Sequence, residues 1–143
     1  MSQRPDIGAL VGKWSYRSFL PIAELETDFN DLEFGRATIT IVEAPFGVLA
    51  GTIGGEGWQL DLSGSINYGD PFSVRFQGRG TLGGDEWIYD YQGYVIKSWP
   101  NGVDQVPAIV GSIVRTIPHP DGGGGTSPAG VVCNWIAVWR TGL

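Results

Sequence analysis

Apolar and polar side chains alternate along several stretches of the chain with a period of two residues. In the stretch 58–67, apolar residues and one glycine occupy the even positions, and polar residues occupy the odd positions. The stretch 72–80 repeats this pattern, and the stretch 12–19 sets Trp14 and Tyr16 between polar neighbours. Successive side chains of a β-strand point to opposite faces, so this period predicts strands with one buried face. The three stretches agree on an interior rich in aromatic rings.

Eight segments carry strand-like patterns and are separated by clusters of Gly, Pro, Asn and Asp. They span residues 12–19, 35–43, 47–53, 58–67, 72–81, 86–98, 105–117 and 130–140. Most connections are short and therefore join antiparallel neighbours, because a parallel pair needs a crossover of about a dozen residues. Closure of an eight-stranded sheet removes its exposed edges. We therefore predict an all-β fold, an eight-stranded antiparallel up-and-down (meander) β-barrel, with a two-sheet sandwich as the alternative.

The other segments are expected to be accessory parts of a single domain over residues 1–143. Residues 1–11 form an N-terminal arm. The stretch 20–34 is a long acidic first loop with enough residues for a short helix. Residues 118–129 form a loop whose glycine content predicts flexibility. Glycines inside the strands indicate places where strands bend or approach closely.

The sixth segment, 86–98, allows two registers with different functional meanings. One register turns Trp87, Tyr89 and Tyr91 inward, and the other turns Asp90 and Gln92 inward. The aromatic set is favoured, because it continues the interior that the other strands predict. A carboxylate inside a barrel is costly and usually has a task. The opposite register would therefore indicate catalysis.

The last two strand segments are apolar on both faces, which is unusual for a wall that meets water. Their outer wall is expected to be covered by a second copy of the chain, most simply in a symmetric homodimer. The alternative is that the N-terminal arm or the acidic loop covers it.

Composition narrows the class of partner. The chain has 143 residues, of which 42% are hydrophobic, with six Trp, five Tyr and six Phe, so it can build a large core. The formal net charge of −6 repels nucleic acids and anionic membranes, and neither is expected as a partner. The single cysteine, Cys133, cannot form an internal disulfide, and the first residues lack the apolar run of a signal peptide. A cytoplasmic, soluble protein is expected.

The sequence offers few residues that could bind a metal or take part in nucleophilic catalysis. With one His and one Cys, the chain lacks the set of ligands that zinc requires, and the acidic loop lacks the alternating pattern of a calcium loop. His119 lies next to the glycine run 122–125 and is not expected to serve a catalytic triad. That run lacks the Lys-Ser/Thr of a phosphate-binding loop. No metal and no cofactor are expected.

The segment Val11-Gly12-Lys13-Trp14 places a Gly-x-Trp motif at the head of the first predicted strand, and the last strand ends in Trp139-Arg140. In these features the chain resembles the calycin superfamily, in which lipocalins and avidins begin the barrel with such a tryptophan. The resemblance implies that Trp14 plugs the closed end of the barrel and that Arg140 packs across it as a cation–π partner. It does not imply biotin binding.

An aromatic-lined barrel suits a small apolar or aromatic molecule, and binding of such a metabolite is the leading hypothesis. The expected ligand contacts are aromatic residues of the interior, namely Trp14, Tyr16, Trp58, Phe76, Tyr89, Tyr91 and Trp135. The alternative is a cofactor-independent isomerase or cyclase in which Asp90, Tyr91 and Tyr16 supply the acid–base groups. A third possibility is a filled barrel that serves as a structural or interaction protein. Whether the protein is an enzyme stays open at this point.

Overall fold

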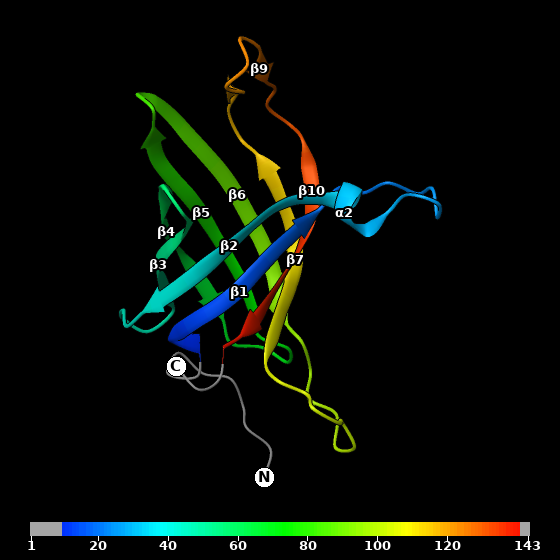
Figure 1. The fold of residues 1–143 in the computed structure, drawn as a ribbon. Helices are drawn as coiled ribbons and strands as arrows, with labels where there is room; N and C mark the ends of the chain where they lie inside the picture. Colours follow the sequence, from blue (N-terminus) through cyan, green and yellow to red (C-terminus); the bar gives the residue numbers. More distant parts are fainter. Residues whose placement is uncertain (1–9, 141–143) are drawn as a thin grey trace.

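A computed structural model describes residues 10–140, which fold into a closed antiparallel β-barrel (Figure 1). The barrel strands are β1 (Gly12–Phe19), β2 (Glu33–Val42), β3 (Val48–Gly55), β4 (Trp58–Asn67), β5 (Ser73–Leu82), β6 (Asp85–Val95), β7 (Ala108–Arg115) and β10 (Val132–Trp139). Their order around the barrel is β1-β10-β7-β6-β5-β4-β3-β2. The predicted eight-stranded up-and-down barrel is confirmed, and the sandwich alternative is wrong.

The barrel closes where its first and last strands meet. β1 pairs with β10 from Trp14↔Trp139 to Phe19↔Asn134, and it pairs with β2 on its other side. Closure gives each barrel strand two hydrogen-bonded neighbours, so none of them presents an open edge.

Two of the connections between barrel strands carry structure of their own. The acidic loop between β1 and β2 contains the short helix α2 (Phe29–Leu32), as the length of this loop allows. Between β7 and β10, the strands β8 (His119–Pro120) and β9 (Thr126–Ser127) pair as a small hairpin at the end of the barrel where β7 ends (Figure 1). No helix within residues 10–140 combines the length and the apolar character needed to cross a membrane.

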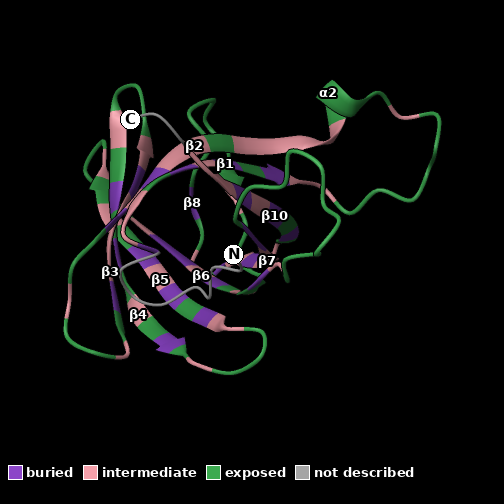
Figure 2. Cartoon of the chain, turned by 90° about the horizontal axis from the view of Figure 1, so that it is seen from below, coloured by how far each residue is buried: buried purple, intermediate pink, exposed green. Residues whose placement is uncertain are grey.

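Alternating side chains form the core, as the colouring along the strands in Figure 2 shows. Along β4 the even positions are buried or half-buried, and every odd position is exposed. The same alternation in β6 turns Tyr89 and Tyr91 into the core and packs Trp87 against it. The favoured register of the sixth strand is therefore confirmed.

Glycines make room for a large ring in the wall between β6 and β7. A Cβ atom on Gly111 would lie only 1.8 Å from the Gln92 carbonyl oxygen of the neighbouring strand. Gly111 pairs with Gly93, and a Cβ on Gly93 would lie 2.9 Å from the indole of Trp135. The indole N–H of Trp135 donates to the Ser112 carbonyl at 2.9 Å. The Trp135 ring thus occupies space that a side chain at Gly93 would otherwise fill, and Gly111 lets the two strand backbones approach closely.

The end of the barrel where β1 begins is filled by tryptophans. Trp14 has no exposed surface, and its ring meets that of Trp139 edge-on, with 5.2 Å between the ring centroids. The indole N–H of Trp14 donates to the Leu10 carbonyl at 2.9 Å. Among the described residues, these two large rings fill this end of the barrel and the polar group of Trp14 is satisfied.

The expected packing of Arg140 across Trp14 is wrong. Arg140 follows the inward-facing Trp139, so its side chain points to the opposite face of the strand. There its guanidinium donates to the hydroxyls of Ser15 and Thr38.

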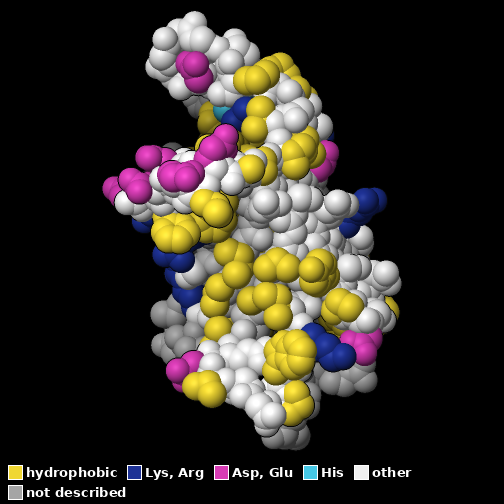
Figure 3. Space-filling view, turned by 90° about the vertical axis from the view of Figure 1, so that its right-hand side faces the viewer, with side chains coloured by type: hydrophobic (Ala, Val, Ile, Leu, Met, Phe, Trp, Pro, Cys, Tyr) yellow, Lys and Arg dark blue, Asp and Glu magenta, His cyan; other side chains and the backbone are white. Residues whose placement is uncertain are grey.

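The outer wall of β7 and β10 is apolar. Its apolar half-buried or exposed side chains are Val110, Val114, Val132, Ile136 and Val138, and the polar Ser112 and Asn134 lie among them. Hydrophobic side chains gather in the middle of this face in Figure 3, below the acidic groups of the first loop. Of the two alternative covers, the N-terminal arm and the acidic loop, most of the arm lies outside the described residues. The homodimer through this wall stays a prediction.

Candidate functional site

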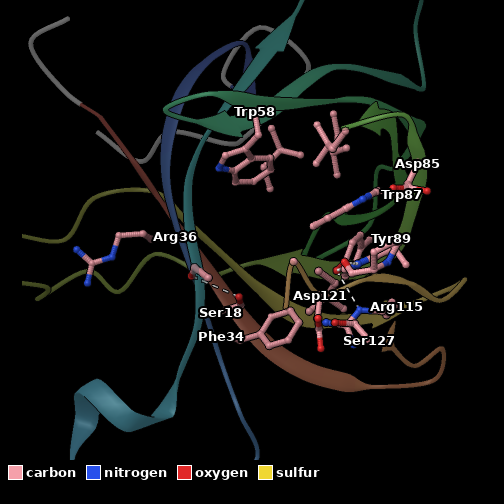
Figure 4. A pocket seen from close by; sticks show the side chains of 18 of the residues that line it. Ser18, Phe34, Arg36, Trp58, Asp85, Trp87, Tyr89, Arg115, Asp121 and Ser127 are labelled. Atoms are coloured by element: carbon pink, nitrogen blue, oxygen red, sulfur yellow. Dashed lines mark hydrogen bonds between the residues drawn. The ribbon is translucent and has the colours of Figure 1, made fainter. Parts of the chain in front are cut away.

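The end of the barrel where β1 ends holds a cavity of about 760 Å³. Its wall consists of the ends of β1, β3, β5 and β7, the beginnings of β2, β4 and β6, the β5–β6 turn and part of the β8–β9 hairpin (Figure 4). Six aromatic rings line it, from Tyr16, Phe34, Trp58, Trp87, Tyr89 and Tyr91. A concave site of this size, mostly apolar with a few polar groups, is typical of small-molecule binding.

The predicted ligand contacts divide into three groups. Those that line the cavity are Tyr16, Trp58, Tyr89 and Tyr91. Phe76 and Trp135 do not line it but pack against Tyr91, with centroid distances of 4.7 Å and 6.1 Å, and so support its position. Trp14 lies at the filled end and is fully buried. The cavity thus has an aromatic floor that is itself held by a second layer of rings.

Tyr16 brings a polar atom without a partner to this floor. Its side chain is 5% exposed, and its hydroxyl is the one buried side-chain polar atom of residues 10–140 without a hydrogen bond. The nearby Ser18 hydroxyl donates instead to the Gly35 carbonyl at 3.4 Å. Burial raises the pKa of the Tyr16 phenol well above its usual 10, and Ser18 offsets only part of the effect. At neutral pH the hydroxyl is therefore a protonated, unused hydrogen-bond donor.

A chain of hydrogen bonds runs along one side of the cavity. Nε of Arg115 donates to the Tyr89 hydroxyl at 3.1 Å, and this hydroxyl lies 2.8 Å from Nε2 of His119. Nδ1 of His119 lies 3.0 Å from the Pro120 carbonyl, which only accepts, so Nδ1 carries a proton. In the neutral imidazole Nε2 is then the acceptor, and Tyr89 donates to it. Each bond fixes the direction of the next.

Stacked rings hold the same groups in place. The His119 imidazole lies flat on the Trp87 indole, with 3.5 Å between centroids and 6° between planes. The Arg115 guanidinium lies over the rings of Phe34 and Tyr89, at 5.4 Å and 5.7 Å from their centroids. Cation–π contacts of this kind partly compensate a buried cation.

The candidate acid–base groups have different surroundings. Asp90 lies on the outer face of β6, where its carboxylate accepts from Nε2 of Gln77 at 2.9 Å and from the Thr116 hydroxyl at 2.8 Å. It therefore has no access to the cavity. Tyr16 and Tyr91 face the cavity, and burial raises the pKa of both phenols, so they stay protonated at neutral pH.

The sequence did not point to Arg115 as a site residue, and His119 was considered there only as a member of a catalytic triad. The alternation along β7 could have predicted Arg115, because it lies at an odd-numbered position and so shares the inward face with Ile109 and Ile113. His119 had no such signal, because it lies beyond the strand in a glycine-rich segment. It is nevertheless 5% exposed, because the β8–β9 hairpin brings it against Trp87.

Comparisons of the chain with protein-family models, with curated proteins and with solved structures find no match.

Proposed function

We propose that this protein is a calycin-like barrel that binds a small apolar or aromatic metabolite in the cavity above Tyr16 and Tyr91. The observation that carries the proposal is a cavity of about 760 Å³ with an aromatic lining and a buried hydroxyl that lacks a partner. Protein interiors are normally packed as densely as organic crystals, and at the other end of this barrel Trp14 is fully buried. A hollow opposite end favours a container over a filled scaffold.

A ligand would gain from both features of the cavity. Apolar surface that it removes from water contributes roughly 25 cal/mol per Å². The Tyr16 hydroxyl is covered in the empty cavity, so a small side-chain movement that brought a ligand acceptor atom to it would also relieve an unmet hydrogen bond, which costs about 1–3 kcal/mol when buried. We therefore expect a ligand with a flat apolar body and at least one acceptor atom.

Two measurements test this proposal. Native mass spectrometry of freshly purified protein is expected to show a small molecule that co-purifies with the chain. Titration with N-phenyl-1-naphthylamine, a neutral dye that brightens in apolar surroundings, is expected to show saturable binding of one dye per chain. The proposal would be contradicted if no small molecule co-purified with the protein and the dye also showed no increase in fluorescence.

A pair of substitutions locates the dye. Leu82 lines the cavity at its mouth, and Leu82→Trp is expected to reduce dye binding because the larger ring takes up part of the space. Thr81 is the preceding residue and is exposed, so Thr81→Trp adds the same ring outside and is expected to leave binding intact. Equal effects of the two substitutions would place the dye elsewhere.

The Tyr89–His119 pair favours a second candidate, a cofactor-independent isomerase that uses the same cavity. The 2.8 Å contact joins a phenol to a base, and Arg115 beside it would stabilise negative charge on a substrate oxygen. In this version Tyr89 and His119, in place of Asp90, would take a proton from a substrate carbon and return it at another.

Deuterium uptake distinguishes an isomerase from a container. The co-purified molecule would be incubated with the protein in D2O, and its mass followed with time. An isomerase is expected to introduce deuterium at the carbon that loses its proton, and Tyr89→Phe is expected to slow this exchange. Binding without any deuterium exchange would agree with the binding function and exclude the isomerase.

A further inference from the structure

The cavity wall contains a buried cation whose charge the described residues do not balance. Arg115 is 8% exposed, and a guanidinium stays protonated in proteins. Buried charges in proteins are normally paired, because an unpaired one loses its hydration without compensation. Arg115 therefore needs either a partner within the chain or one from outside.

The partners of Arg115 in the described part of the chain are neutral. Its Nε donates to the Tyr89 hydroxyl, and its Nη1 donates to the Pro128 carbonyl at 3.2 Å. Within residues 10–140 no carboxylate lies within 4.0 Å of the guanidinium, and Nη2 donates to no side chain or carbonyl. The guanidinium thus keeps donor capacity on the side that its two neutral partners do not use.

The other charged groups that line the cavity are exposed to water or bonded to other partners, and none of them pairs with Arg115. The Asp121 carboxylate is exposed and accepts from the backbone N–H groups of Gly123 and Gly125, which lower its pKa. Asp85 is exposed at the mouth. Arg36 pairs with Glu33, and its side chain points away from the cavity in Figure 4, whereas Arg115 lies beside Tyr89 in the wall.

From this arrangement we infer that the cavity selects ligands that carry one carboxylate on an apolar, preferably aromatic, body, and that Arg115 binds the carboxylate. This inference rests on the proposed binding function and specifies its ligand class. A carboxylate matches the planar fork of a guanidinium. A polyanion such as a nucleotide is disfavoured, because one cation would face several negative charges in a chain of net charge −6.

Three naphthalenes of nearly the same shape test the inference on the wild-type protein. The competitors 2-naphthoate, methyl 2-naphthoate and 2-naphthalenemethanol would each displace N-phenyl-1-naphthylamine at pH 8, where the acid is ionised. A hydrogen bond to a charged group contributes more than a neutral one, so we expect 2-naphthoate to bind about tenfold more tightly than the alcohol. Equal affinities would overturn the inference, while the binding function would stand.

Substitutions assign the preference to one side chain. Arg115→Gln removes the charge and is expected to bring the acid-to-alcohol preference close to one. Arg79→Gln makes the same change on an exposed outward-facing position of β5 and is expected to keep the preference. A preference that survives Arg115→Gln would overturn the inference.

A measurement on the unmodified chain covers the case in which Arg115→Gln does not fold. In protein labelled with ¹⁵N-arginine, 2-naphthoate is expected to shift the Nε–H resonance of Arg115, and 2-naphthalenemethanol is expected to shift it much less. Arg115→Lys, which keeps the charge, assigns the resonance by removing it. Equal shifts by both compounds would contradict carboxylate recognition. Failure of all naphthalenes and of the dye to bind would instead contradict the binding function itself.

Discussion

The Tyr89 hydroxyl lies 2.8 Å from Nε2 of His119 and connects the barrel wall to the hairpin that overhangs the cavity. Tyr89 belongs to β6, and His119 belongs to β8, so this contact crosses from the rigid barrel to a segment that holds only two short strands. The same hydroxyl accepts from Arg115. One phenol thus positions the base, the cation and the hairpin together.

Removal of this hydroxyl is expected to destabilise the protein although the change is small. Tyr89→Phe leaves Nε of Arg115 and Nε2 of His119 without their shared partner, at a cost of about 1–3 kcal/mol in the free energy of unfolding. Urea unfolding followed by tryptophan fluorescence measures this cost. Tyr94→Phe on the same strand serves as the control, because that side chain is 51% exposed on the outer face. Equal effects would mean that the chain of hydrogen bonds contributes nothing.

His119 is expected to hold the hairpin against the barrel. His119→Leu removes both the stacking on Trp87 and the bond to Tyr89, so amide hydrogen exchange should accelerate in residues 116–131 and stay unchanged in β3 and β4. Thr126→Ala, at an exposed hairpin position, is the matched control. Unchanged exchange in the hairpin would show that other contacts hold it.

Alkaline pH is expected to unfold the barrel through its buried phenols. Burial raises the folded-state pKa of Tyr16 and Tyr91 above the unfolded value near 10. Above pH 10 the unfolded chain therefore releases protons that the folded chain retains, and stability falls by about 1.4 kcal/mol per pH unit for each phenol. Below pH 10 this contribution is fully present.

Urea midpoints between pH 9 and 12 measure that loss. Tyr16→Phe removes one of the two phenols and should make the decline with pH shallower. An equal decline in Tyr16→Phe and wild type would show that Tyr16 titrates like an exposed tyrosine.

The close contact between β6 and β7 is expected to tolerate no side chain at Gly111. A Cβ there meets the Gln92 carbonyl at 1.8 Å, so Gly111→Ala must push two strands apart, at a cost of about 3 kcal/mol. Gly123→Ala, where the new Cβ would lie 3.6 Å from the Asp121 carboxylate, should change stability little. Thermal unfolding of the two variants compares the sites, and similar melting temperatures would contradict the close approach.

Cys133 is expected to report on opening of the barrel. It is 1% exposed, and burial raises the pKa of its thiol, so a thiol reagent such as dithionitrobenzoate should react slowly with the folded protein and rapidly in urea. The variant Cys133→Ala/Asn134→Cys moves the thiol to the exposed neighbouring position and should react at once. Rapid reaction of the wild-type thiol would mean that β10 detaches readily.

Local patterns predicted the barrel well, because each strand buries one face. The alternation in β4 and β5 set their registers without ambiguity, and aromatic rings at odd positions of β6 outweighed Asp90 between them. The predicted position of Arg140 was wrong for a related reason. The resemblance placed it across Trp14, whereas the alternation of β10 turns the residue after Trp139 outward.

The candidate site was harder to predict because its polar groups come from elements that no local period connects. Tyr89 and Arg115 are paired across β6 and β7, so a correct strand alignment brings them together. His119 reaches Tyr89 only because the chain turns back after β7, and no periodicity marks such a turn. The aromatic floor was therefore predictable, and the chain of hydrogen bonds beside it was not.

Closure of β1 onto β10 also bears on how the molecule folds. The side-chain contact between Ser15 and Arg140 joins positions 125 residues apart, so the seam can form only after all the residues between them have been synthesised. Contacts of such long sequence separation slow folding, because the entropy of closing the loop must be lost before they form. Until then β1 and β7 each present an unpaired edge, and a chain in this state is open to pairing with another copy.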